Sequence, residues 1–261
     1  MKRILLGSSI AMFLLGSCKK EVTEYNPDVK AALSVEFDNI AGSSDLQLNT
    51  GIYTDLSGES FSINKLKYFV SNFKLVKIDG TIFTVPQQDC YFLIDEGEED
   101  SHEPVLQIPE GEYKSIIFNI GIDNNKNCQD PHTYTGSLDT AGLASDMYWN
   151  NSQGYIFFNI EGNSPASLSG NFIYHIGGSG TAAFPAISNL KAVTIDLTER
   201  GTPRVKAGKE TNIHLMVDVL QLFSAETNFR IADNPEVMFD PFSAIIANNY
   251  SKIFRHDHTE N

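Results

Sequence analysis

The fold is best indicated by the stretch Asp146-Met-Tyr-Trp-Asn-Asn-Ser-Gln-Gly-Tyr-Ile-Phe-Phe-Asn-Ile-Glu-Gly162. A polar, turn-like run that contains the only tryptophan, Trp149, leads directly into an alternating strand. Alternation with a period of two residues is typical of a half-buried β-strand. The stretch therefore predicts a β-strand that begins directly after a polar turn.

The same period of two residues recurs along most of the chain. Asp79-Gly80 is a hairpin signal between two of these strands. Many short strands separated by Gly, Asn, Asp and Pro predict an all-β protein, an antiparallel β-sandwich. The predicted strands cover residues 33–37, 61–77, 81–85, 91–94, 115–120, 155–160, 172–175, 192–197 and 212–217.

One amphipathic helix is predicted near the C-terminus, over about 241–254. Asp240 can cap it, Pro241 suits its first turn, and the apolar residues that follow form one stripe. A shorter helical turn is expected at 219–223. The irregular segment between Ile120 and Tyr155 is long for a compact domain, and segments of this length are usually functional or disordered.

Residues 1–17 have the pattern of a bacterial lipoprotein signal peptide. Two basic residues precede an apolar run that is too short for a stable membrane-spanning helix. The run ends in Leu15-Gly16-Ser17-Cys18, a lipobox in which Cys18 would carry the lipid; the alternative is an ordinary secretory signal. Polar residues 18–30 are expected to form a flexible linker. The domain 31–261 would then be anchored to the outer membrane of the cell envelope, facing either the periplasm or the outside.

The composition argues against two classes of function. The net charge is −14 and the basic residues are not clustered, whereas nucleic-acid binding needs a basic surface. The chain also lacks Gly-x-Ser-x-Gly, His-Glu-x-x-His and a phosphate-binding loop, so we do not expect an enzyme. Glu96 to Asp100 and Glu103 are expected to form a solvated acidic loop.

Two cysteines, Cys90 and Cys128, remain after lipidation of Cys18. In an oxidising compartment an even number of cysteines predicts a disulfide, and the alternative is two buried thiols. The run Asp123-Asn-Asn125-Lys-Asn127 begins like a calcium loop. Cys128 and Tyr134 stand where that loop needs glycine and glutamate, so we expect an Asn-rich turn instead.

Six histidines are candidate metal ligands, because imidazole is the commonest ligand of transition metals in proteins. His132 lies in the long irregular segment and His175 at a strand end before two glycines. His214 lies on the polar face of its strand, as a solvated or hydrogen-bonded side chain. His256-Asp-His258 could bind copper or zinc if extended, but a frayed terminus is the simpler interpretation. Spacing alone assigns a site to none of them.

The order of several motifs resembles the MbnP-like family. The matching elements, over about residues 31–223, are Gly121-Ile-Asp123, Pro131-His132, Met147-Tyr148-Trp149, Gly154-Tyr155 and Tyr174-His175-Ile176-Gly177. The family's second tryptophan falls on Asn151 in this chain.

The resemblance implies a copper-binding protein. In this family copper is held by histidines together with a kynurenine formed by oxidation of a tryptophan, so the implied site residues are His132, Trp149 and His175. It also implies a di-haem peroxidase-like partner that performs the oxidation, and an outer-membrane transporter is a further candidate partner. The alternative is a metal-free surface lipoprotein that binds a glycan or a protein.

Overall fold

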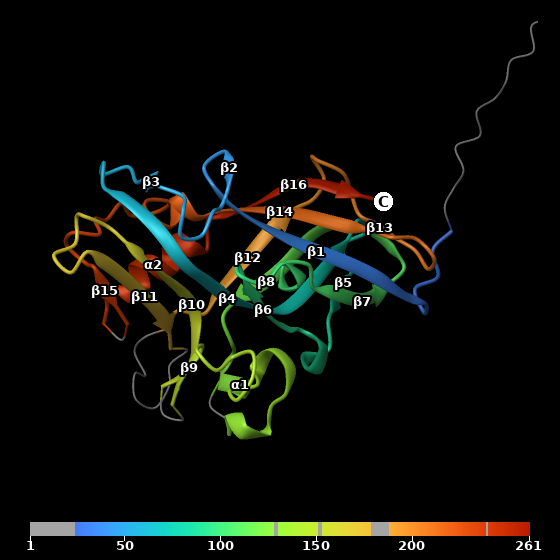
Figure 1. Ribbon diagram of the computed structural model, residues 1–261. Coiled ribbons are helices and arrows are strands. Elements are labelled where there is room, and N and C mark those ends of the chain that lie inside the picture. The colour runs from blue at the N-terminus through green and yellow to red at the C-terminus, as the bar shows by residue number, and fades with distance from the viewer. Residues whose placement is uncertain (1–23, 128–129, 151–152, 179–187, 239) are drawn as a thin grey trace, which may run out of the picture.

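Two β-sheets pack face to face in the computed structural model, which confirms the predicted sandwich (Figure 1). The structure describes residues 24–127, 130–150, 153–178, 188–238 and 240–261. The predicted signal peptide, Cys18 and Asn151 lie outside these residues. Every strand predicted from the period of two residues is present, with ends shifted by a few residues.

The smaller sheet has five strands in the order β16-β14-β1-β2, with β7 also pairing with β1. The strands β1 and β14 are parallel to each other, so the sandwich is not purely antiparallel. Their bounds are β1 Lys30–Ala41, β2 Ser44–Asp45, β7 Val105–Pro109, β14 Asn212–Asp218 and β16 Phe254–Glu260.

The larger sheet is curled around its longest strand, β4 (Ser60–Lys77), and follows the order β12-β8-β4-β10-β11-β15 (Figure 1). Five short strands pair with members of this path. The remaining bounds are β3 Tyr53–Thr54, β5 Ile82–Thr84, β6 Tyr91–Asp95, β8 Gly111–Ile120, β9 Tyr148–Asn150, β10 Gly154–Asn163, β11 Asn171–Gly177, β12 Lys191–Asp196, β13 Arg204–Val205 and β15 Glu236–Val237.

The main core lies between the inner faces of the two sheets. Phe37 of β1 meets Phe118 of β8 edge to face, with ring centroids 5.5 Å apart. Tyr68 of β4 stacks on Phe158 of β10 at 5.5 Å. That pair lies within the larger sheet, whereas Tyr68 also meets Phe37 of the smaller sheet, with ring centroids 6.3 Å apart. Aromatic side chains bury large apolar areas, so the contacts of Phe37 join the two sheets. The side chains that alternate with them point away from the core, onto the two outer faces.

The C-terminal helix is shorter than predicted. Helix α2 spans Ser243–Tyr250, residues 251–253 form a turn, and Phe254, the last residue of the predicted helix, begins β16. The tail is therefore not frayed, because its backbone pairs with the free edge of β14. The other helical segments are short: α1 Asn124–Asn127, η1 Gln87–Asp89, η2 Glu99–Ser101, η3 Pro131–Thr133, η4 Gly136–Leu138 and η5 Val219–Phe223. The last of these is the predicted helical turn.

The long segment between β8 and β10 folds over the outer face of the larger sheet. It forms a second, smaller hydrophobic cluster there, in which Met147 and Leu138 pack with Phe69, Tyr155 and Phe157. The expected Asn-rich turn is found at α1, where the Asn127 side chain accepts a hydrogen bond from Tyr155 N at 2.7 Å. This part of the segment is thus ordered by burial.

The end of the predicted linker is attached to the domain. Asn26 N donates a hydrogen bond to Glu110 and Tyr25 donates one to Glu112. Among the described residues, none of the helices has the length and apolar character needed to cross a bilayer.

Candidate metal-binding sites

His175 lies on the outer face of the larger sheet, in a row that crosses three strands. It is paired in register with Asn159 of β10, which is paired in turn with Lys67 of β4. Side chains alternate between the two faces of a strand, and Tyr174 and Ile176 point into the core. His175 therefore points outward, beneath the segment that covers this face.

A carboxylate fixes the ring of His175. Its Nε2 lies 3.0 Å from Glu161 Oε1, and Lys65 contacts the same oxygen at 3.2 Å. Burial alone would raise the pKa of Glu161, but the hydrogen bonds from His175 and Lys65 hold this pKa below its ordinary value. Because an ionised carboxylate can only accept, Nε2 donates, and a neutral ring keeps the lone pair on Nδ1. Ligating histidines in metal sites show this same pairing with a carboxylate.

The indole of Trp149 packs on the backbone of Gly177. A Cβ atom added at Gly177 would lie 2.6 Å from Trp149 Cζ3, so only glycine allows this approach. Gly177 is two residues beyond His175 and therefore on the same face of β11, about 7 Å along the strand. The structure thus brings Trp149 and His175, two of the three predicted site residues, to one place.

Asp146 attaches the other end of the short segment 146–149, which contains Trp149, to the larger sheet. Its carboxylate contacts Lys65 at 3.4 Å and Lys67 at 3.1 Å, both on β4. Asp146 and Trp149 therefore contact the strands on either side of β10. The segment between them bridges the outer face of β10, where Asn159 lies.

Asn159 is fully buried on this face, and neither atom of its side-chain amide has a hydrogen-bond partner among the residues that the structure describes. Burying a polar group without a partner costs free energy, so such groups need an explanation. Here the amide lies between His175 and Lys67 in the row described above. It is an additional polar group available to a ligand on this face.

His132 is not joined to the other two residues. It lies in η3, with its side chain exposed and its backbone N bonded to Asp130. Among the residues that the structure describes, no hydrogen bond, ion pair or ring contact links His132 to Trp149 or His175. Its role as a ligand stays a prediction.

Cys90 is a buried free thiol, which donates a weak hydrogen bond to the Gln87 carbonyl at 3.3 Å. Burial raises the pKa of this thiol. In this structure Cys90 therefore matches the alternative of a buried thiol, and Cys128 lies outside the described residues.

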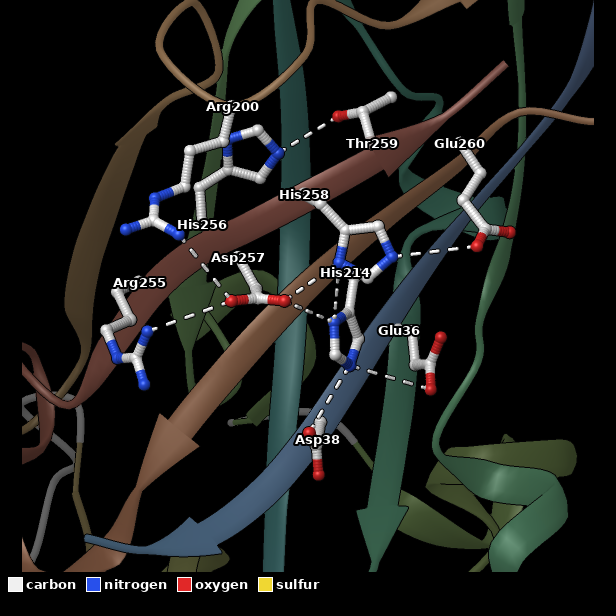
Figure 2. A network of polar contacts seen from close by, with 10 residues as sticks. All are labelled: Glu36, Asp38, Arg200, His214, Arg255, His256, Asp257, His258, Thr259 and Glu260. Atoms are coloured by element: carbon white, nitrogen blue, oxygen red, sulfur yellow. Dashed lines mark hydrogen bonds and ion pairs between the residues drawn. The ribbon is translucent and has the colours of Figure 1, made fainter. Parts of the chain in front are cut away.

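A second group of metal-binding side chains lies on the outer face of the smaller sheet (Figure 2). It consists of His214 on β14 together with Asp257 and His258 on β16, and one potential ligand atom from each lies within 4.8 Å of the others. The expectation of a hydrogen-bonded His214 is confirmed. Its sequence context gave no sign of the two partners, because only the pairing of β14 with β16 brings them together.

Comparisons with known proteins agree with this architecture. The sequence model of the family described as MbnP matches residues 30–239. The solved structure of MbnP from Methylosinus trichosporium matches with a TM-score of 0.54 and 18% identity, over 78% of this chain and 80% of that chain. At this identity the likeness concerns the fold. No curated protein matches the chain in sequence.

Proposed function

The chain belongs to the MbnP family, and from this premise we propose that it binds copper in the cell envelope and is not itself an enzyme. The observation that carries the proposal is the packing of Trp149 on Gly177, on the same face of β11 as His175. The family resemblance implies that both Trp149 and His175 are members of a copper site. Their convergence supports a site here.

The residues on this face suit copper. His175 offers an imidazole nitrogen whose other nitrogen is fixed by Glu161, and imidazole is a preferred ligand of copper. Trp149, once oxidised to kynurenine, would supply an amine beside it. The unpartnered amide of Asn159 offers a further polar contact. His132 is the candidate for a second imidazole, from the exposed η3 turn.

The envelope location follows from the predicted lipobox. We propose that Cys18 carries the lipid and that the linker after it places the domain on the outer membrane. A di-haem peroxidase-like protein would act as the partner that oxidises Trp149, and an outer-membrane transporter as the partner that exchanges copper. A Cys18→Ser variant should move from the membrane fraction to the soluble fraction; retention in the membrane fraction would contradict lipidation.

Copper binding is tested on protein purified from its native host, with metal content measured after dialysis and Trp149 examined by peptide mass spectrometry. A His258→Gln background removes the cluster on the opposite sheet from the measurement. In that background we expect copper to be retained, and to be lost in His175→Gln and Trp149→Phe. Lys209→Gln, at an exposed turn before β14, is the control. An unmodified Trp149 together with no retained copper would overturn the proposal and favour the metal-free alternative.

A further inference from the structure

The second metal-binding group depends on a β-bulge between β14 and β16. His214 pairs with His258 and Leu215 with His256, so Asp257 is an extra residue on β16. In a regular strand Asp257 and His258 would point to opposite faces. A bulge redirects side chains, and here both point toward His214 (Figure 2).

Three ligand atoms converge on one position. His214 Nδ1 lies 3.2 Å from His258 Nδ1 and 3.3 Å from Asp257 Oδ2, and His258 Nδ1 lies 2.8 Å from the same carboxylate oxygen. Ligands held 2.0–2.1 Å from a tetrahedral ion lie about 3.3 Å from one another. The triangle therefore matches one face of such a tetrahedron, with the ion about 1 Å out of its plane.

Carboxylates also face the outer nitrogens of both imidazoles. His214 Nε2 is 3.3 Å from Asp38 Oδ2 and 3.8 Å from Glu36 Oε1, while His258 Nε2 is 3.6 Å from Glu260 Oε1. Ligating histidines are usually oriented by carboxylates in this manner, which leaves the inward nitrogen available to the metal.

A cation at the centre of these three atoms would be in contact with all of them at once.

The surroundings attract and admit a cation. Four carboxylates, from Glu36, Asp38, Asp257 and Glu260, surround the position. Two guanidinium groups, from Arg200 and Arg255, approach only the outer oxygen of Asp257, at 3.9 and 4.0 Å. The side chain of His258 is 47% exposed, so an ion can enter from solvent.

We propose that His214, Asp257 and His258 bind a transition-metal dication of the zinc or copper(II) class through Nδ1, Oδ2 and Nδ1. Two imidazoles and one carboxylate suit these ions, whereas calcium and magnesium prefer a shell of oxygens. Three protein ligands leave one tetrahedral position open to solvent or to an added ligand. Asp257 and His258 follow the residues that the family model matches, so this site is separate from the family resemblance.

The inference does not rest on the proposed copper function. His214 points outward from the smaller sheet and His175 outward from the larger one, so the two sites occupy opposite faces of the sandwich. Variants at one site leave the ligands of the other in place. Each proposal can therefore fail without the other.

The test is titration of the purified chain with Zn²⁺ by calorimetry, and with Co²⁺ by absorption, which reports tetrahedral geometry. We expect one Zn²⁺ per chain at this site. His258→Gln should weaken binding at least tenfold, and Asp38→Asn should weaken it about 10–100-fold by freeing the His214 ring. His102→Gln, at a histidine outside both groups, is the matched control and should bind as the unaltered chain does. His175→Gln distinguishes this site from the proposed copper site.

Far-UV circular dichroism would establish that each variant is folded, and thermal unfolding provides a second measurement. Zn²⁺ should raise the unfolding temperature of the unaltered chain but not that of His258→Gln. Absence of Zn²⁺ binding, or equal affinity in the unaltered chain, His258→Gln and His214→Gln, would overturn the assignment. Loss of binding only in His175→Gln would also overturn it.

Discussion

Trp149 and Gly177 are in direct contact, and the ring of the tryptophan occupies the space that a Cβ atom on residue 177 would need. This contact places the only indole of the chain on the same face of β11 as His175. Glycine is therefore required at position 177, at the end of β11, because of packing and not because of an unusual backbone angle.

A Cβ atom at Gly177 would lie 2.4 Å from the Tyr155 carbonyl oxygen and 2.6 Å from Trp149 Cζ3, so Gly177→Ala should displace both the indole and the start of β10. Overpacking of this kind costs about 1–3 kcal/mol of stability. Because Trp149 is the only tryptophan, its fluorescence should shift to longer wavelength as the ring becomes more exposed. Copper affinity should fall in parallel. The control is Gly97→Ala, at an exposed turn where the added methyl group has more room. An unchanged emission spectrum in Gly177→Ala would refute the packing.

Substitution of Asn159 tests whether the outer face of the larger sheet is adapted to binding a ligand rather than to stabilising the fold. Asn159→Leu removes a buried amide that has no partner, so the metal-free chain should become more stable by about 1–3 kcal/mol. Copper binding should weaken at the same time. Urea unfolding measures the first effect and metal retention the second. Asn163→Leu, at the exposed end of the same strand, is the control. Destabilisation of the metal-free chain would contradict the interpretation.

Sequence periodicity was sufficient for the strands but not for the pairing between them. Residues 33–37 and 212–217 alternate clearly, yet nothing in either segment indicates that β1 and β14 lie side by side in parallel. That Trp149 lies on the same sheet face as His175 could be predicted only from the order of motifs in the family. The alternation of a segment predicts a strand, but it does not identify the strand with which that segment pairs.

The cluster around His214 illustrates the limit most directly. His256-Asp-His258 was interpreted as a frayed end, since a short tail with few apolar residues predicts no strand. The free edge of β14 supplies the missing hydrogen-bond partners, and the bulge at Asp257 then decides where two side chains point. Neither the edge nor the bulge can be recognised from the residues of the tail.

Glu96 was expected in a solvated acidic loop, but its side chain is only 9% exposed. Burial raises its pKa to about 7, and hydrogen bonding to Asn39 and the charge of His102 offset this only in part. The folded chain therefore holds this proton more tightly than the unfolded chain does. Its contribution to stability is fully present below the ordinary pKa and is lost as the pH rises toward 7.

Glu96→Gln should remove this pH dependence. The variant should gain stability over the unaltered chain between pH 5 and pH 8, on the order of 1–2 kcal/mol after allowance for screening by solvent. Chemical unfolding at several pH values measures the difference. Glu98→Gln, at an exposed position two residues later, should follow the unaltered chain. Parallel pH profiles for the unaltered chain and Glu96→Gln would rule out the buried carboxyl as the cause.

Substitution of Phe254 tests whether β16 is packed as an integral strand of the sandwich. Its ring lies in the core, 5.4 Å from the ring of Phe118 and 6.2 Å from that of Phe37. Phe254→Ala should therefore lower the free energy of unfolding by about 3–5 kcal/mol, as expected for loss of a buried aromatic. Urea unfolding measures this change. Arg255→Ala, next along the same strand and exposed, should change stability by no more than about 0.5 kcal/mol. If both variants were equally stable, the tail would not be packed, and the bulge that directs Asp257 and His258 toward His214 would have no fixed position.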